Sequence, residues 1–261
     1  MQKVVVYALD IGVYNTGAIG NVLNSTTTAW SRLSQGIENI KDIQYDNNSF
    51  IYTPNNRKPV IFECGRSLEQ LAEKIAADIK KKHKIALGFE APMWIPLENL
   101  HRANLRLFEP RFEAEKGHAW YLQAGAAATL KAISLGIMLR NHLNLLEDNI
   151  NCITCIDHWT PGSIILYEAF VAGNYKLENN IGNNRQNEWD AFTAGLAWGS
   201  RHCGFHIPDR YIGRTLHNAG RRAAEGLPLL SIWNLIFEEC PATSECEVVA
   251  IQSEEKNNGK E

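Results

Sequence analysis

The chain has 261 residues, 45% of them hydrophobic, which is enough to bury one sizeable core. Its formal net charge of −3 excludes a protein that coats nucleic acid through an overall positive charge, so any polyanion must bind at a local site. The apolar run after Met1 is too short for a signal-peptide core or for a membrane span, and we therefore expect a cytoplasmic protein.

The N-terminal segment reads as a buried strand over residues 4–10, because an apolar run ends at Asp10 and is followed by the turn formers Gly12, Asn15 and Gly17. Residues 18–23 are then expected to form its hairpin partner. Residues 24–59 are polar and rich in Asn, Ser, Thr and Asp, with little sustained periodicity. This composition predicts an insertion or long loop.

A strand over residues 59–64 is followed by a helix, for which Ser67 is the predicted N-cap and whose apolar residues recur at helical spacing. Basic residues at 80–84 end the helix, as its dipole favours. Residues 85–90 form the next strand, which ends on Glu90 and is broken by Pro92. The element order to this point is βββαβ.

After a loop over residues 93–113, residues 115–146 form a predicted helix with an apolar stripe at Ala126, Leu130, Ile133 and Ile137. Residues 153–159 and 163–170 are candidate strands, and 187–200 form a helix with Asp190 near its start. We expect a single domain over residues 1–235 and an acidic, disordered tail over 236–261.

Asp10 and Glu90 each close an apolar strand, and the ends of neighbouring strands lie side by side in a sheet. Carboxylates in such places are disfavoured by desolvation and by mutual repulsion, and a divalent cation relieves both. Taken singly, each acid has another explanation: Asp10 serves the turn after it, Glu90 pairs with an arginine, and Asp190 favours a helix N-terminus.

Four segments carry a family resemblance: ALDIG around Asp10, GFEAPMWIP around Glu90, YEAFVAG around Glu168 and NEWDAFTAGLAW around Asp190. With the element order, they make residues 3–200 similar to the ribonuclease H-like superfamily. The chain resembles RuvC-type resolvases and an uncharacterised family of predicted nucleases, the latter particularly through the proline after Glu90. The resemblance implies an α/β fold with a mixed five-stranded sheet (βββαβαβα), flanked by helices and carrying loop insertions.

The resemblance also implies that Asp10, Glu90 and Asp190 bind Mg²⁺ or Mn²⁺ and support hydrolysis of phosphodiester bonds in DNA or RNA, with in-line attack by water. Resolvases often carry a further ligand three residues before the last aspartate, one helical turn back, where this chain has the neutral Asn187. Glu188 is close but should face another way, and Glu168 is the candidate that compensates. The departure at Asn187 leaves a one-metal site or a non-catalytic site as open alternatives.

Candidate substrate-binding residues lie near the same acids in the sequence. Arg102 and Arg111 follow Glu90 and are suited to hold a phosphate, with ion pairs to nearby glutamates as the alternative. Trp94 and Trp189 flank the acids and are candidates for stacking on a base, although core packing is the favoured alternative. We expect a nucleic-acid substrate and no membrane, with a homodimer as an open alternative.

The sequence also leaves alternatives to the nuclease open. Residues 10–16 resemble the first phosphate loop of actin-like and sugar-kinase ATPases, but the second phosphate turn and the adenosine segment of those kinases are not found. A catalytically degenerate fold that binds a partner is a third reading. Cys152, Cys155, Cys203 and His206 have zinc-like spacing, yet residues three apart on a strand face opposite sides, which favours buried thiols.

Overall fold

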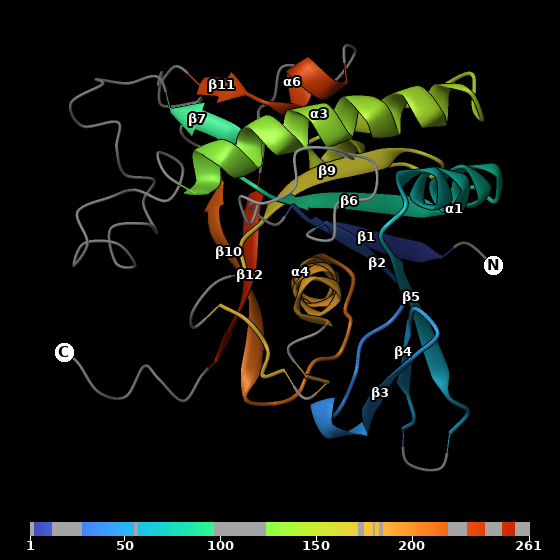
Figure 1. Cartoon of the computed structure of the whole chain (residues 1–261), viewed down its shortest axis with the longest axis vertical. Helices are drawn as coiled ribbons and strands as arrows, with labels where there is room; N and C mark the ends of the chain where they lie inside the picture. The colour runs from blue at the N-terminus through green and yellow to red at the C-terminus, as the bar shows by residue number, and fades with distance from the viewer. Residues whose placement is uncertain are drawn as a thin grey trace, which may run out of the picture.

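The computed structural model describes residues 3–11, 28–54, 57–96, 124–171, 175–179, 181–182, 185–218, 229–237 and 247–253. Within these ranges the chain is an α/β protein with a mixed sheet of ten strands and four helices. Figure 1 shows α3 (Ala124–Asn144) and α1 (Leu68–Lys80) on one side of the sheet and α4 (Gln186–His202) on the other. The short α6 (Trp233–Ile236) lies beside α3.

The centre of the sheet consists of five strands. Strand β1 (Val4–Asp10) pairs antiparallel with β2 (Ala29–Leu33), which pairs antiparallel with β5 (Val60–Gly65). On its other side β1 pairs parallel with β6 (Lys84–Glu90), and β6 pairs parallel with β9 (Ile164–Ala169). The spatial order β5-β2-β1-β6-β9 therefore places the first strand in the middle.

Further strands extend this centre in both directions. Beyond β5 lie β4 (Ser49–Tyr52) and β3 (Ile43–Asp46), which the 3-10 turn η2 (Ile40–Asp42) precedes. Beyond β9 lie β12 (Glu247–Ser253) and β10 (Tyr211–Asn218), and β8 (Cys152–Ile153) also pairs with β9. A separate small sheet joins β7 (Trp94–Pro96) to β11 (Leu229–Ser231).

Side chains alternate between two cores. On β1, Val5, Tyr7 and Leu9 belong to the core that α1 and α3 cover, whereas Val6 and Ala8 belong to the core that α4 covers. This period of two follows from the pleat of a strand. It decides which face receives each carboxylate at a strand end.

Several predicted elements are confirmed. The strands at 4–10, 59–64, 85–90 and 163–170 correspond to β1, β5, β6 and β9, and the helix at 187–200 corresponds to α4. In α1 the Ser67 hydroxyl accepts a hydrogen bond from the Gln70 N–H at 3.2 Å, which is the predicted N-cap. Its predicted apolar residues are buried, so the helical spacing identified the face that packs on the sheet.

The region 24–59 is not a long loop, because β2, β3 and β4 lie in it. The proposed hairpin partner at 18–23 falls outside the described residues, and the strand that pairs antiparallel with β1 is β2. The asparagines that suggested a loop belong partly to a tight β3–β4 turn, where Asn47 and Asn48 have φ of 45° and 58°. Asn tolerates this left-handed backbone, so it marks a hairpin turn here.

The long helix is rotated from its predicted orientation. Leu130 is 71% exposed and Ile133 and Ile137 are half-buried, while the buried stripe runs through Ala128, Ala132, Leu135, Leu139 and Leu143. The helix is apolar around most of its circumference, so its sequence does not single out one face. Residues 115–123 of the predicted helix and its position Ala126 lie outside what the structure describes.

Three further predictions are wrong. The described sheet has ten strands, not five. In the predicted strand at 153–159 only Ile153 belongs to a strand, and Ile156–His158 form the 3-10 turn η4. The tail at 236–261 was expected to be disordered, but Glu247–Ser253 form β12, whose residues 248–251 are fully buried between β9 and β10. The sequence did not reveal this strand because its short apolar run is flanked by glutamates, which made the whole segment look acidic and disordered.

Candidate functional site

Asp10 and Glu90 are the last residues of two adjacent parallel strands and lie in register with each other. By the alternation along β1 and β6, both belong to the face that α4 covers. Asp10 is 6% exposed, and a hydrogen bond joins its side chain to that of Glu90. Two carboxyl groups share such a bond only when one of them carries a proton. The pair is thus a buried, strongly interacting site.

Glu90 is the most perturbed of these acids. Burial raises its pKa well above the usual range, and repulsion from Asp10 and then Asp190 adds to the rise, while Lys176 opposes it. Its buried Oε2 atom has no hydrogen-bond partner within the described part of the chain. A buried carboxylate oxygen without a donor is costly, which is the situation that a cation at this atom would relieve.

Asp190 acts on the same site from α4, since its charge raises the pKa of Glu90. Gln186, one turn earlier, donates a hydrogen bond from Nε2 to Asp190 Oδ1 at 2.6 Å, and Lys176 Nζ lies 4.0 Å from the same oxygen. Burial raises the pKa of Asp190, and Lys176 and Gln186 partly offset that rise. The Ser31 hydroxyl of β2 donates to the Ala191 carbonyl at 2.9 Å and so fixes the helix over the sheet.

The three acids form a close pair and a more distant third member. In the described ranges, no group of three or more His, Cys, Asp or Glu side chains is arranged to hold a metal ion. The donors at the pair are hard carboxylate oxygens, the type that Mg²⁺ and Mn²⁺ prefer. The orphaned Glu90 oxygen fits such an ion, with Asp190 contributing its charge from α4.

Glu168 does not join the acids. It pairs with Phe89 across the β6–β9 ladder and therefore projects on the α1 and α3 side, away from Asp10 and Glu90. The side chain is fully buried, and its Oε2 accepts a hydrogen bond from the Met93 N–H at 2.9 Å. Its proposed role as a compensating catalytic acid is not supported by this placement, and it instead secures the turn after β6.

Asn187 and Glu188 occupy the first turn of α4. Asn187 is half-buried and, three residues before Asp190, lies on the same side of the helix. Glu188 is only 2% exposed and is bound by Arg66 and Arg185, so it faces away from Asp190 as expected.

The tryptophans are core residues. Trp94 and Trp189 are both fully buried, and Trp189 packs against Phe50 and Phe192. Neither ring is open for a base to stack on it, so the suggested substrate contact at Trp94 is not supported and core packing holds for both. Arg102 and Arg111 lie outside the described residues.

Three cations near the acids were missed from the sequence. Lys131 of α3, only 9% exposed, and Arg66 interact electrostatically with Asp10, while Lys176 acts on Glu90 and Asp190. Lys131 had a detectable signal, since it is a lysine within the apolar first half of the long helix α3. Arg66 and Lys176 lie in turns, where the pattern gives no direction to a side chain.

Comparison of the chain with protein-family models, with curated proteins and with solved structures finds no match. Among the helices that the structure describes, none is both long enough and apolar enough to cross a bilayer. The site's geometry is therefore the main basis for a functional proposal.

Proposed function

We propose that this protein is a metal-dependent phosphodiesterase that hydrolyses DNA or RNA on a ribonuclease H-like fold. The observation that carries the proposal is the pairing of Asp10 and Glu90 at the ends of adjacent parallel strands, below the helix that bears Asp190. Buried acids close together at the ends of strands are unfavourable without a cation and are typical of functional sites.

The arrangement of the central strands supports the proposed fold. The strands β1, β2 and β5 are neighbours in the sheet and pair antiparallel, with β3 and β4 inserted in the chain between β2 and β5; α1 follows, and then come the parallel strands β6 and β9 with α3 between them. Without the inserted strands, this order is compatible with the one that the resemblance implies. The five further strands, β3, β4, β8, β10 and β12, pair beyond β5 or beyond β9 and leave that centre intact.

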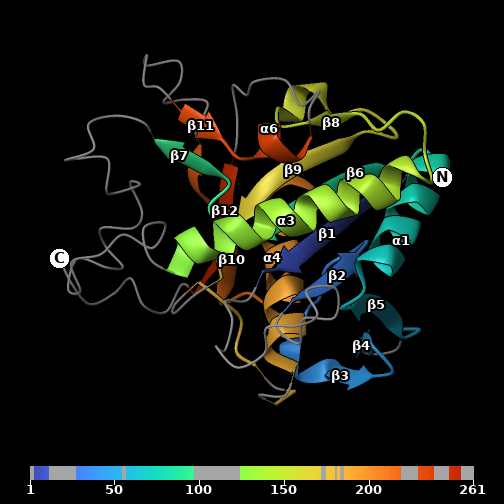
Figure 2. The same cartoon turned by 45° about the horizontal axis from the view of Figure 1, so that its top comes forward.

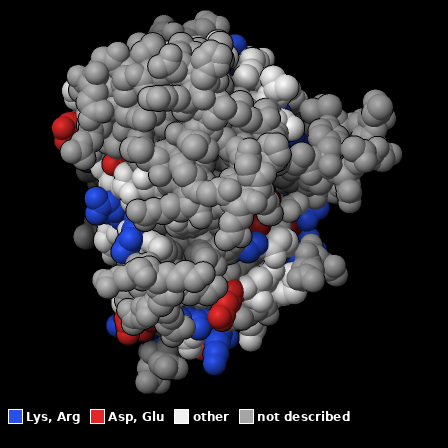
Figure 3. Space-filling view, turned by 90° about the vertical axis from the view of Figure 1, so that its left-hand side faces the viewer, with Lys and Arg blue, Asp and Glu red and all other residues white. Residues whose placement is uncertain are grey.

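The charges around the acids support an anionic substrate bound locally. Lys131, Arg66 and Lys176 come from three different segments and surround a site that is itself acidic. Figure 3 shows the side toward which β1 and β6 run, where the described basic and acidic side chains are interspersed. A phosphate group would thus be attracted by these nearby cations and by a bound ion.

Asp10 and Glu90 would hold the ion, and Asp190 would complete the negative environment. A bound Mg²⁺ or Mn²⁺ supplies activation of water and stabilisation of the leaving oxygen. Ionised Asp10 and Glu90 are the binding-competent forms, and the chain's own cations favour those forms: Lys176 lowers the pKa of Glu90 against the effects of burial.

Metal titration and cleavage assays test the proposal together. Mn²⁺ binding by calorimetry and cleavage of single-stranded, duplex and branched DNA and RNA are measured for the wild type and for Asp10→Asn, with the exposed Asp209→Asn as control. We expect Asp10→Asn to lose both binding and cleavage and Asp209→Asn to keep both. Cleavage that is equal in the wild type and Asp10→Asn would contradict the assignment.

A catalytically degenerate partner-binding module is the second candidate. It is favoured by one observation, that the described acids do not form a ready three-ligand metal group. It predicts a wild type that neither binds Mn²⁺ nor cleaves nucleic acid. The phosphate loop of the kinase alternative lies mostly outside the described residues.

A further inference from the structure

Glu188 is a charged side chain in a buried position, where charged side chains are uncommon. It lies in the first turn of α4, two residues before Asp190, and is 2% exposed. Arg66, in the turn between β5 and α1, donates from Nε to Oε1 at 3.0 Å and from Nη2 to Oε2 at 3.1 Å. Such a bidentate ion pair fixes both the distance and the relative orientation of the two side chains.

Arg185 adds a second attachment to the same carboxylate. Its Nη1 lies 3.3 Å from Glu188 Oε1, and its guanidinium stacks over the Tyr45 ring of β3 at 4.8 Å. The first turn of α4 is thereby tied to two segments, the β5–α1 turn and the β3 strand. Both ties meet at Glu188, two residues before Asp190: Arg66 binds its carboxylate directly, and Arg185 links it to Tyr45.

Arg66 also acts on the acid pair itself, since its charge interacts with Asp10. Arg66 therefore binds the acid that anchors α4 and also interacts with the acid that closes β1. We propose that Arg66 is a positioning residue of the metal site: through Glu188 it sets the first turn of α4 so that Asp190 faces Asp10 and Glu90. The proposal rests on the proposed function, because it assumes that these acids bind a divalent ion.

A buried ion pair contributes less to stability than its geometry suggests, because desolvation offsets the attraction. Replacement of both partners by apolar residues of similar volume is often neutral or stabilising. This allows the positioning role to be separated from a merely structural one, since the double variant Arg66→Met with Glu188→Met removes the tie without leaving a buried charge.

Mn²⁺ binding is measured by calorimetry, and folding by urea denaturation, for the wild type, Arg66→Lys, Arg66→Met and the double Met variant. Arg66→Lys keeps the charge and loses the bidentate geometry. The control is Arg210→Met, which removes an exposed Arg–Glu pair of 2.7 Å with Glu178. We expect the Arg66 variants and the folded double variant to bind Mn²⁺ about 10–100-fold more weakly, the range for residues that orient metal ligands.

Wild-type affinity in the folded double variant would overturn the inference and leave the proposed function standing. Restored affinity in Arg66→Lys alone would reduce the role of Arg66 to its charge and would also overturn it. A wild type that binds no Mn²⁺ would contradict the proposed function, and the inference with it.

Discussion

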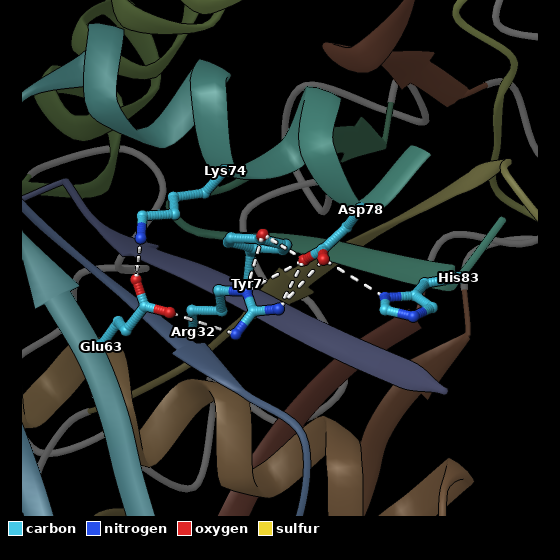
Figure 4. A network of polar contacts seen from close by, with 6 residues as sticks. All are labelled: Tyr7, Arg32, Glu63, Lys74, Asp78 and His83. Carbon is cyan, nitrogen blue, oxygen red and sulfur yellow. Dashed lines mark hydrogen bonds and ion pairs between the residues drawn. The ribbon is translucent and has the colours of Figure 1, made fainter. Parts of the chain in front are cut away.

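Tyr7 and Asp10 lie on the same strand, yet their side chains enter two buried polar clusters of opposite character. On the α1 side, the Tyr7 hydroxyl donates to Asp78 Oδ2 at 2.6 Å, and Arg32 donates to both oxygens of Asp78 at 2.9 and 3.0 Å. Figure 4 shows this network, with His83 at one end and Glu63 at the other. On the α4 side, Asp10 is hydrogen-bonded to Glu90, with which Asp190 interacts electrostatically from α4.

The first cluster is balanced and the second is not. Burial raises the pKa of Tyr7 well above its usual range and thus keeps the phenol neutral. The charge of Asp78 and the hydrogen bonds with Asp78 and Tyr7 favour the charged Arg32 guanidinium and raise its pKa, although its burial acts the other way. In the acid cluster, like charges face one another and one buried oxygen has no described donor. A balanced buried cluster serves the fold, whereas an unbalanced one indicates a ligand.

The largest expected effect lies in the balanced network. Asp78→Ala leaves Arg32 without its main partner in a place where its side chain is only 20% exposed. We expect a loss of about 3–5 kcal/mol in the free energy of unfolding, as for other broken buried pairs. Urea denaturation measures it. Glu63→Ala, at the half-exposed end, should lose only about 0–1 kcal/mol, and equal losses would remove the distinction between the two ends.

Divalent metal should stabilise the protein through the other cluster. A ligand that binds only the folded state at 100 times its dissociation constant adds about 2.7 kcal/mol. Thermal unfolding with Mg²⁺ or Mn²⁺ should therefore shift upward in the wild type and in Glu63→Ala. The shift should vanish in Glu90→Gln, and a persisting shift would place the ion elsewhere.

Glu90→Gln should itself change stability in the direction opposite to Asp78→Ala. It removes a carboxyl group whose ionised form is disfavoured by burial and by repulsion from Asp10 and Asp190, so the metal-free variant should gain about 0.5–2 kcal/mol, as at other sites where function opposes stability. Urea denaturation in the presence of a chelator is the measurement. A destabilised variant would show that Glu90 contributes to the fold in the manner of Asp78.

The contrast between the clusters also separates what the sequence predicts from what it does not. Asp10 and Glu90 were predictable because each ends an apolar strand, and parity along the strands then places both on one face. Glu168 was assigned by the same strand-end pattern. No sequence pattern shows, however, that β9 directs this side chain to the face covered by α1 and α3. Arg32 and Asp78 look like ordinary surface charges on their elements, because pairing across 46 residues leaves no local trace.

The smallest expected effect is the pH dependence of the metal-free protein. The pKa of Glu90 is raised in the folded state above the value of about 4.3 in an unfolded chain. The folded state therefore binds more protons in this window, so the contribution is fully present below the unfolded pKa and is lost as pH rises through the folded one. Asp190, also raised, acts in the same direction. In urea denaturation with a chelator, stability should fall more steeply toward neutral pH in the wild type than in Glu90→Gln. Identical slopes would show that Glu90 does not carry the shift, and the acid cluster would then be as well compensated as the network around Asp78.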